Sequence, residues 1–258
     1  MRTLYVIGVG PGDPEQLTVQ AINALNRVDV FFVLDKGEVK ADLVALREEI
    51  LRRYVEQPGY RVVHGRDPDR DRTASGYGAA VHDWRRRRAD VCERMLREEL
   101  ADGQVGAFLV WGDPALYDST IGIVEDIARR GTLQLDWHVV PGISSVSALA
   151  ARHRTGLNQV AGAVQVTTGR RLRAGLPEGV DDVVVMLDAH GQFADLADQD
   201  LEIFWGAYVG TPDEVLVHGP LAEVAGQILA LRAEARARKG WIMDSYLLRR
   251  TTSGGDGT

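Results

Sequence analysis

Three short apolar runs in the first part of the chain each end in a loop built from glycine, proline, aspartate or serine. The loops are residues 8–14, 111–117 and 141–145. The preceding runs are short and rich in β-branched residues, which predicts buried strands. In an open parallel sheet, ligands bind beyond the carboxyl ends of the strands. The three loops together therefore predict one shared ligand cleft.

Segments with apolar residues at helical spacing separate the strands of this first half. We predict strands at residues 4–9, 28–34, 61–63, 105–111 and 135–140, and helices at 17–25, 41–55, 79–100 and 120–130. Strands that alternate with helices imply a parallel sheet with right-handed crossovers. The predicted fold class is therefore α/β.

The second half has fewer helices per strand. We predict strands at residues 164–168, 183–187, 203–209, 215–218 and 241–247, a weak helix at 193–197 and a strong one at 221–238. This pattern favours a mixed sheet in a separate domain. The expected domains are residues 1–142 and 143–250, followed by a disordered tail at 251–258.

Composition narrows the class of protein. The formal net charge of −7 argues against general nucleic-acid binding, which depends on neutralising phosphates. The single cysteine, Cys92, excludes an internal disulfide framework, and the histidines show no zinc-ligand spacing, so no metal is expected. No apolar run is long enough to cross a membrane, and no signal-peptide core precedes the first glycine loop. We expect a cytoplasmic protein with a small-molecule ligand.

The first loop has to be compared with the dinucleotide-binding pattern Gly-x-Gly-x-x-Gly. Gly8 and Gly10 match it, but Asp13 stands where the third glycine is required. Its negative charge is also unsuited to a pyrophosphate site at a helix N-terminus. Asp35, after the second strand, does lie where a ribose-binding acid is expected. A NAD-binding oxidoreductase therefore remains as an alternative.

The three loops, taken in order, resemble the motifs of the tetrapyrrole (corrin and porphyrin) methylase family. The matching segments are Gly-x-Gly-Pro-Gly-Asp-Pro with a following Leu17-Thr18, then Gly-Asp-Pro-x-x-Tyr at 112–117, then Pro-Gly-Ile-Ser-Ser at 141–145. The resemblance implies two α/β domains with S-adenosylmethionine bound in the cleft between them, and a homodimer.

Other segments resemble the deacetylating branch of this family in aerobic cobalamin biosynthesis. They are residues 33–37, 67–72, 108–114 with 117–120, and 243–250. The resemblance implies a C-methyltransferase that methylates carbon 1 of a ring-contracted corrinoid precursor and releases the acetyl group of that carbon as acetate by hydrolysis.

The resemblance also implies which residues bind the cofactor. The expected contacts in the first domain and at its end are Pro11, Trp111, Gly112, Asp113, Leu116, Ser144 and Ser145. Those expected from the second domain are Met186, Leu187, Ala207 and Gly210. Asp113 could accept a hydrogen bond from a ribose hydroxyl or the amino group, whereas Met186 and Leu187 could equally be core residues at a strand end.

Hydrolysis of the acetyl group needs a base and a group that stabilises an oxyanion. Asp35 and Lys36 end a predicted strand where the substrate is expected, so the carboxylate could activate water and the ammonium could steady the oxyanion. Tyr117 could donate a hydrogen bond, and His190 is a third possible base. A structural role is an alternative for three of them. Asp35 could cap a helix, Tyr117 could be a core aromatic residue and His190 could lie in a surface turn.

Arginine outnumbers lysine 27 to 3, and 13 of the arginines lie between Arg47 and Arg97. Coding bias can explain the ratio, but Arg also binds carboxylates in a bidentate way. A corrinoid precursor carries acetate and propionate groups around its rim. We predict that four arginines of this segment clamp that rim: Arg47, Arg66, Arg70 and Arg72. We expect the run at 85–88 to be partly solvated and paired with Asp83, Asp90 or Glu93.

Three alternatives to this activity remain open at the sequence level. The first is a relative with the same cofactor and another acceptor. The second is the NAD-binding oxidoreductase. The third is a non-catalytic corrinoid-binding protein on the same fold.

Overall fold

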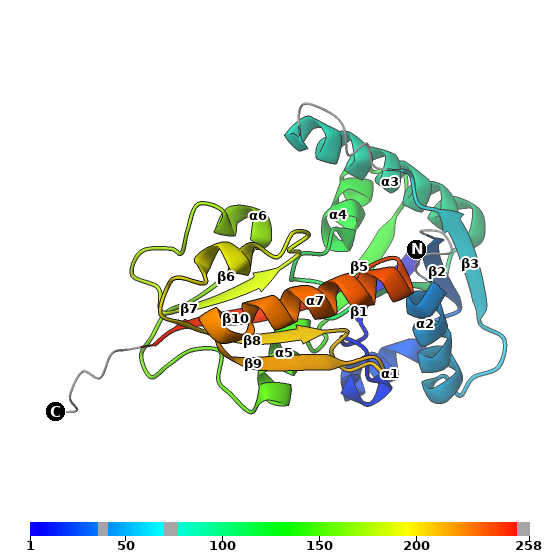
Figure 1. Cartoon of the computed structure of the whole chain (residues 1–258). Coiled ribbons are helices and arrows are strands. Elements are labelled where there is room, and N and C mark those ends of the chain that lie inside the picture. Colours follow the sequence, from blue (N-terminus) through cyan, green and yellow to red (C-terminus); the bar gives the residue numbers. More distant parts are fainter. Residues whose placement is uncertain (36–40, 70–76, 252–258) are drawn as a thin grey trace. The chain divides into compact units, whose positions relative to one another are not determined.

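The computed structural model describes residues 1–35, 41–69 and 77–251, with the backbone alone for residues 35, 41–44 and 77–81. The chain divides into two compact units, Met1–Ile143 and Ser144–Thr258. The predicted tail, apart from Thr251, lies outside the described residues. Figure 1 labels the elements, and each unit is treated below by itself.

The sheet of the first unit is parallel, as predicted, with the order β3-β2-β4-β1-β5. Its strands are β1 (Arg2–Gly8), β2 (Val30–Asp35), β3 (Arg61–Arg66), β4 (Val105–Val110) and β5 (Leu135–Val140). The central strands β1 and β4 are nearly continuous apolar runs. That composition is typical of strands whose two faces are both covered by helices.

Two pairs of helices cover the two faces of this sheet. α1 (Val19–Leu25) and α2 (Ala41–Tyr54) pack on one cluster of buried residues that includes Ile7 and Leu109. α3 (Tyr77–Glu99) and α4 (Thr120–Arg130) pack on another that includes Val6 and Val110. Neighbouring residues of one strand thus serve opposite faces, as pleating requires. All four predicted helices are confirmed to within two residues.

The second unit contains a mixed sheet, also as predicted, with the order β6-β7-β10-β8-β9. Its strands are β6 (Val164–Thr168), β7 (Asp182–Met186), β8 (Leu201–Ala207), β9 (Val215–Pro220) and β10 (Asp244–Arg250). β6 and β7 are parallel, whereas β10 is antiparallel to both β7 and β8.

Several strand boundaries of this unit were predicted wrongly, by one to three residues. β7 and β8 end one and two residues early because Leu187 (φ 55°) and Tyr208 (φ 50°) adopt the left-handed conformation, which no strand can continue. The predicted strand 241–247 is in fact β10 and begins only at Asp244. Its first three apolar residues instead pack against the core as they lead out of the preceding helix.

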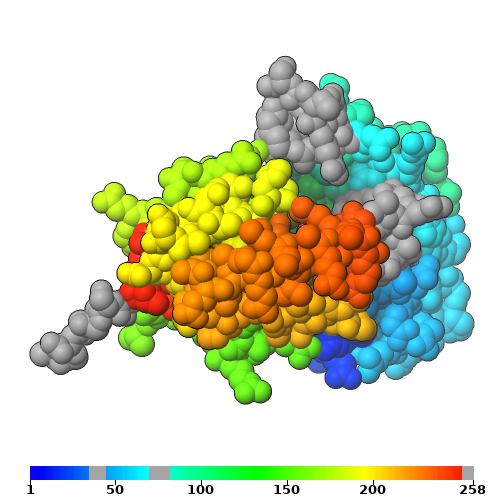
Figure 2. Space-filling view, viewed as in Figure 1, coloured from blue at the N-terminus to red at the C-terminus, as the bar shows by residue number. Residues whose placement is uncertain are grey.

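The helices of this unit are α5 (Ser145–His153), the four-residue α6 (Gly169–Leu172) and α7 (Leu221–Lys239), with a 3-10 turn at Gln192–Leu196. α7 was predicted, whereas α5 was missed. In Figure 2 the orange atoms of α7 lie over the visible face of the unit. α5 packs on the opposite face, where Gly206 leaves room for Leu149; a Cβ at Gly206 would lie 2.7 Å from the Leu149 side chain.

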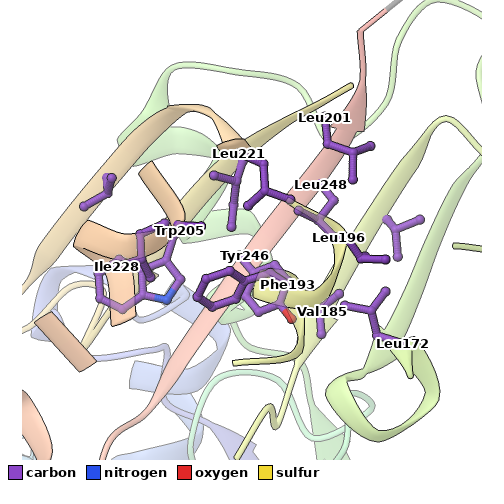
Figure 3. Packing of buried hydrophobic residues seen from close by; sticks show 14 of the residues in the cluster. Leu172, Val185, Phe193, Leu196, Leu201, Trp205, Leu221, Ile228, Tyr246 and Leu248 are labelled. Atoms are coloured by element: carbon purple, nitrogen blue, oxygen red, sulfur yellow. The ribbon is translucent and has the colours of Figure 1, made fainter. Parts of the chain in front are cut away.

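The core of the second unit lies between its sheet, α7 and the 3-10 turn. Figure 3 shows its largest side chains, with Tyr246 beside Phe193 and Trp205 near Ile228. The Phe193 and Tyr246 rings meet edge to face with centroids 5.2 Å apart. Leu172 of α6 is also part of this core, so that even this short helix is anchored.

Candidate functional site

The three glycine loops predicted to share a cleft do converge in the first unit, at the carboxyl ends of β4, β1 and β5. A Cβ at Gly142 would lie 2.1 Å from the carbonyl oxygen of Gly112 and 2.8 Å from Gly8. A Cβ at Gly8 would lie 2.6 Å from the backbone nitrogen of Gly142. Only glycine fits at this junction, since real Cβ atoms do not approach backbone so closely.

Hydrogen bonds hold the same junction together. Gly112 N–H donates to the Gly10 carbonyl at 2.8 Å, and Gly10 N–H donates back to the Gly112 carbonyl at 3.3 Å. The Asp113 carboxylate accepts from Gly142 N–H at 2.9 Å and from Ala115 N–H at 2.8 Å. Asp113 was predicted to contact the cofactor; in the structure its carboxylate ties the second loop to the third.

Two buried polar atoms near this junction are left without a partner. They are the Trp111 indole N–H and the Gln16 side-chain carbonyl, for which no hydrogen-bond partner is found within the described residues. Buried polar groups are normally satisfied, so a water or a polar ligand can complete these two groups. Gln16 adjoins the first loop, because a Cβ at Gly10 would lie 3.1 Å from its backbone carbonyl. Pro11, which follows Gly10 in the first loop, is itself buried.

The other residues of these loops have local structural roles. Asp13 caps the 3-10 turn Pro14–Gln16 by accepting from Glu15 N–H at 2.9 Å, which explains the residue that breaks the dinucleotide pattern. Ser144 caps α5, accepting from Ser147 N–H at 3.1 Å, and Ser145 is the first residue of that helix. Leu116 N–H closes a turn onto the Asp113 carbonyl.

The cofactor residues predicted for the second unit lie at one edge of its sheet. Met186 pairs with Ser245 of β10, and Ala207 pairs with Asp244, so the ends of β7 and β8 flank the start of β10. The residue after each strand is left-handed, and Leu187 is 65% exposed despite its apolar side chain. Left-handed backbone in a bulky residue is strained and is typical of ligand sites. Gly210 lies two residues beyond Tyr208, with its N–H bonded to Glu214.

A buried network fixes the loop after β7. The Asp188 carboxylate accepts from the backbone N–H groups of residues 190, 191 and 192 and from the Tyr246 hydroxyl. Arg232 donates to the Asp188 carbonyl at 2.6 Å and forms an ion pair with Asp244, which also accepts from the Trp205 indole at 2.8 Å. Burial raises the pKa of Asp244, and the Arg232 charge opposes that shift.

Leu187→Gly separates the backbone strain of this loop from the side chain that it presents. Glycine adopts positive φ freely, so we expect the free energy of unfolding to rise by about 1 kcal/mol or stay constant. If the Leu187 side chain covers the adenosine moiety, affinity for S-adenosylhomocysteine should fall about tenfold. Chemical denaturation and calorimetry measure the two effects. Unchanged affinity would contradict a cofactor contact at this position.

The predicted catalytic residues are only partly described. Asp35 ends β2 opposite Arg66 of β3, but its side chain and the whole of Lys36 lie outside the described residues. Tyr117 is 46% exposed and has a left-handed backbone (φ 54°), so it is not the core aromatic considered as an alternative. His190 is exposed in the turn whose N–H groups bond to Asp188.

The four arginines of the predicted clamp are placed unevenly. Arg47 is half-buried, and its Nε donates to the Leu109 carbonyl at 3.4 Å. Burial lowers the pKa of Arg47, and the nearby Asp118 charge opposes the shift. Arg66 is exposed, 3.7 Å from Asp69. Arg70 and Arg72 lie outside the described residues, so the clamp of four arginines remains a prediction.

The arginine run on α3 includes a buried ion pair that sequence reasoning missed. Arg86 and Arg87 pair with Asp83 as expected. Arg88 instead is buried, 3.1 Å from the buried Asp67, and donates to the Ser119 hydroxyl at 2.8 Å. Of its two partners, Asp67 follows β3 directly and Ser119 immediately precedes α4. No local spacing could have revealed this contact.

Within the described ranges there is no cluster of three or more side chains suited to a metal, and no helix there is long and apolar enough to cross a membrane. The site of the first unit is therefore a backbone-lined loop junction with an orphaned donor and acceptor. It is suited to an organic ligand with its own polar groups.

Comparison with known proteins shows which family has this fold and these loops. Residues 3–225 match the family described as Tetrapyrrole (Corrin/Porphyrin) Methylases, and the chain belongs to that family. A curated relative from Sinorhizobium sp, "Precorrin-6A synthase [deacetylating]", is 48% identical over 97% of this chain and 96% of its own. These matches rule against the alternative that the chain is a NAD-binding oxidoreductase.

Solved structures agree. A cobalamin synthesis related protein, CobF, from Corynebacterium diphtheriae is 38% identical, with a TM-score of 0.82 over 97% of this chain and 99% of its own. Uroporphyrin-III C-methyl transferase from Thermus thermophilus, complexed with S-adenyl homocysteine, has a TM-score of 0.59 over 95% and 91% of the two chains. At 21% identity it shows the shared fold alone.

Proposed function

We propose that the chain is a deacetylating precorrin-6A synthase, an S-adenosylmethionine-dependent C-methyltransferase of cobalamin biosynthesis. It converts precorrin-5 to precorrin-6A by methylating carbon 1 and releasing acetate. The observation that carries the proposal is the 48% identity to a relative of that name across nearly the full length of both chains. As in the family generally, we expect a homodimer.

The residues present fit the cofactor. The Trp111 N–H and the Gln16 carbonyl provide a donor and an acceptor without a partner among the described residues, next to loops that the glycine junction holds together. We propose that Pro11 of the first loop and Trp111, Gly112 and Leu116 of the second bind the cofactor, with Asp113 tying the second loop to the third. The backbone around Ser144 and Ser145 adds donors. S-adenosylmethionine, when bound, supplies an electrophilic methyl group.

In the second unit we propose that the strand ends hold the adenosine moiety. Met186 ends β7 and Leu187 follows it, whereas Ala207 ends β8 and Gly210 lies three residues further on. The strained backbone at Leu187 supports this proposal, because such conformations persist where a ligand site requires them. The Asp188 carboxylate, which gathers three backbone N–H groups, keeps that loop in one conformation.

Acetate release requires two linked steps on the acceptor. Water loses a proton to a base and adds to the acetyl carbonyl. The bond between that carbonyl and carbon 1 then breaks, so acetic acid departs as acetate and a proton while the electron pair stays on carbon 1, delocalised into the macrocycle. The same electron pair forms the new bond to the methyl group. Holding the reactants in contact can contribute about 7 kcal/mol or more to the methyl transfer.

We propose that Asp35 activates the water, that Lys36 stabilises the oxyanion and that Tyr117 donates a hydrogen bond to it. The support for Asp35 is its place at the carboxyl end of β2, the edge at which the glycine loops also lie. Tyr117 follows the second loop and is exposed enough to reach a ligand. The arginines Arg47, Arg66, Arg70 and Arg72 remain our proposal for the acceptor's carboxylates.

Asp35→Asn tests the assignment of the base. General-base catalysis contributes about a hundredfold or more, so kcat for acetate release should fall by that factor. Affinity for S-adenosylhomocysteine should stay within about twofold, because Asp35 is not a cofactor contact. Rapid-quench assays of acetate and calorimetry measure the two. Acetate release at the wild-type rate would assign the base elsewhere, with His190 as the next variant.

The function itself is tested by binding and turnover under anaerobic conditions. We expect calorimetry to show binding of S-adenosylhomocysteine, and methyl-labelled S-adenosylmethionine to label precorrin-5. Binding of the acceptor without methyl transfer would instead identify a corrinoid-binding protein. Methylation of a different precorrin in preference to precorrin-5 would identify another member of the family.

A further inference from the structure

A pocket of about 670 Å³ in the second unit carries three arginines and has no role in the function described so far. It is lined by Gln165, Thr167, Arg170, Arg171, Leu172, Arg173 and residues 174–177. Among these described lining residues none is acidic. On a chain of net charge −7, this is a local concentration of positive charge.

The element that carries the arginines is held in place. Leu172 lies between them and is 2% exposed within the core of the unit, where Figure 3 shows it beside Val185. Arg173 Nε donates to the Gln192 side chain at 2.9 Å. Arg170 and Arg171 are exposed, and the yellow-green atoms of this segment lie on the surface in Figure 2. The guanidinium groups are therefore presented from a fixed backbone rather than from a free loop.

A second arginine-rich pocket shows the contrast. The pocket of about 590 Å³ between α3 and α4 also holds several arginines, but Glu125 and Asp126 line it too. There Arg86 pairs with Asp83, Arg129 with Asp126 and Arg130 with Glu93. These arginines form ion pairs within the protein. No carboxylate is among the described lining residues of the pocket at α6.

The α6 pocket also lies near the carboxyl ends of β6 and β7, where we propose that the cofactor binds. β6 runs parallel to β7, and Thr168, the last residue of β6, pairs with Met186, the last residue of β7. α6 begins at the next residue, Gly169, where a Cβ would lie 2.5 Å from Asp188. A ligand in this pocket is thus adjacent to the strand end at which the methyl donor is proposed to bind.

We propose that Arg170, Arg171 and Arg173 bind carboxylate side groups on the rim of the acceptor macrocycle. Guanidinium groups form bidentate, charge-assisted hydrogen bonds with carboxylates, and several together can fix the orientation of a polycarboxylate. This subsite rests on the proposed function. It adds a further set of arginines for the acceptor's carboxylates.

The test uses uroporphyrin, a stable macrocycle with acetate and propionate groups, and coproporphyrin, in which methyl groups replace the acetates. Quenching of tryptophan fluorescence in the full chain reports binding of each. We expect uroporphyrin to bind more tightly than coproporphyrin. In Arg170→Gln/Arg171→Gln, affinity for uroporphyrin should fall about tenfold or more and the preference should shrink. Arg171→Lys keeps the positive charge but lacks the planar guanidinium group. Its affinity for uroporphyrin should lie between those of the wild type and the double variant.

The control is Arg94→Gln, which removes one positive charge from an exposed position on α3. It should leave uroporphyrin affinity unchanged, and all variants should bind S-adenosylhomocysteine as the wild type does. Unchanged uroporphyrin affinity in the double variant, or an equal loss in Arg94→Gln, would overturn the subsite. Failure of the proposed function is seen separately, as no methyl transfer to precorrin-5 by the wild type.

Discussion

Replacing Gly142 by alanine is expected to weaken cofactor binding strongly. The added Cβ would lie 2.1 Å from the Gly112 carbonyl oxygen, so the second and third loops must move apart. That movement breaks the hydrogen bond from Gly142 N–H to Asp113. Forcing an atom into such a contact costs about 1–3 kcal/mol of stability. We expect affinity for S-adenosylhomocysteine to fall at least about a hundredfold, as measured by calorimetry.

Gly226→Ala is the matched control for this variant. Gly226 lies in α7, and a Cβ there would meet nothing within 4 Å. Because alanine favours helix over glycine, Gly226→Ala should raise the free energy of unfolding by up to about 1 kcal/mol and leave cofactor affinity unchanged. If Gly142→Ala binds S-adenosylhomocysteine within threefold of the wild type, the loop junction is not the cofactor site.

Replacing Arg232 by methionine is expected to give the largest loss of stability in the second unit. The Arg232 and Asp244 side chains are only 4% and 3% exposed, so the variant leaves a buried carboxylate without its counter-charge. Removing one partner of a buried ion pair costs about 3–5 kcal/mol. Arg232 also donates to the Asp188 carbonyl, so the loop after β7 should loosen and cofactor affinity should fall.

The double variant Arg232→Met/Asp244→Asn should recover much of that stability, because no buried charge remains unpaired. A double-mutant cycle by urea denaturation measures the coupling. pH gives a second readout. Burial already raises the pKa of Asp244, and loss of Arg232 raises it further. A raised folded pKa means that the folded state binds the proton more tightly, so the deficit of the single variant should shrink as pH falls. A deficit independent of pH would contradict this account.

The sequence predicted the architecture better than the contacts within it. The parallel and mixed sheets and the meeting of the three loops follow from strand runs that end in glycine. The ends of β7 and β8 could not be predicted, because Leu187 and Tyr208 continue the apolar pattern and only the left-handed backbone ends each strand. α5 was missed because Ser145–His153 consists mostly of small residues without a strong apolar face.

Side-chain roles in the candidate site were less predictable for a physical reason. A carboxylate at a loop is equally suited to a ligand or to backbone N–H groups, and only the fold shows that Asp113 reaches Gly142. The Arg88–Asp67 pair likewise joins elements that no sequence spacing relates. Gly8 and Gly142 stand in the predicted loops, but only the fold shows that their backbones pack against each other, which glycine allows.

The central claim is that one site both removes an acetyl group and adds a methyl group at the same carbon. The most direct measurement is the ratio of the two products when the protein acts anaerobically on precorrin-5 carrying an isotopic label in its acetyl group, with S-adenosylmethionine labelled in its methyl group. The proposed function predicts one labelled acetate released for each methyl incorporated. Methyl incorporation with the acetyl label retained on the macrocycle would contradict it.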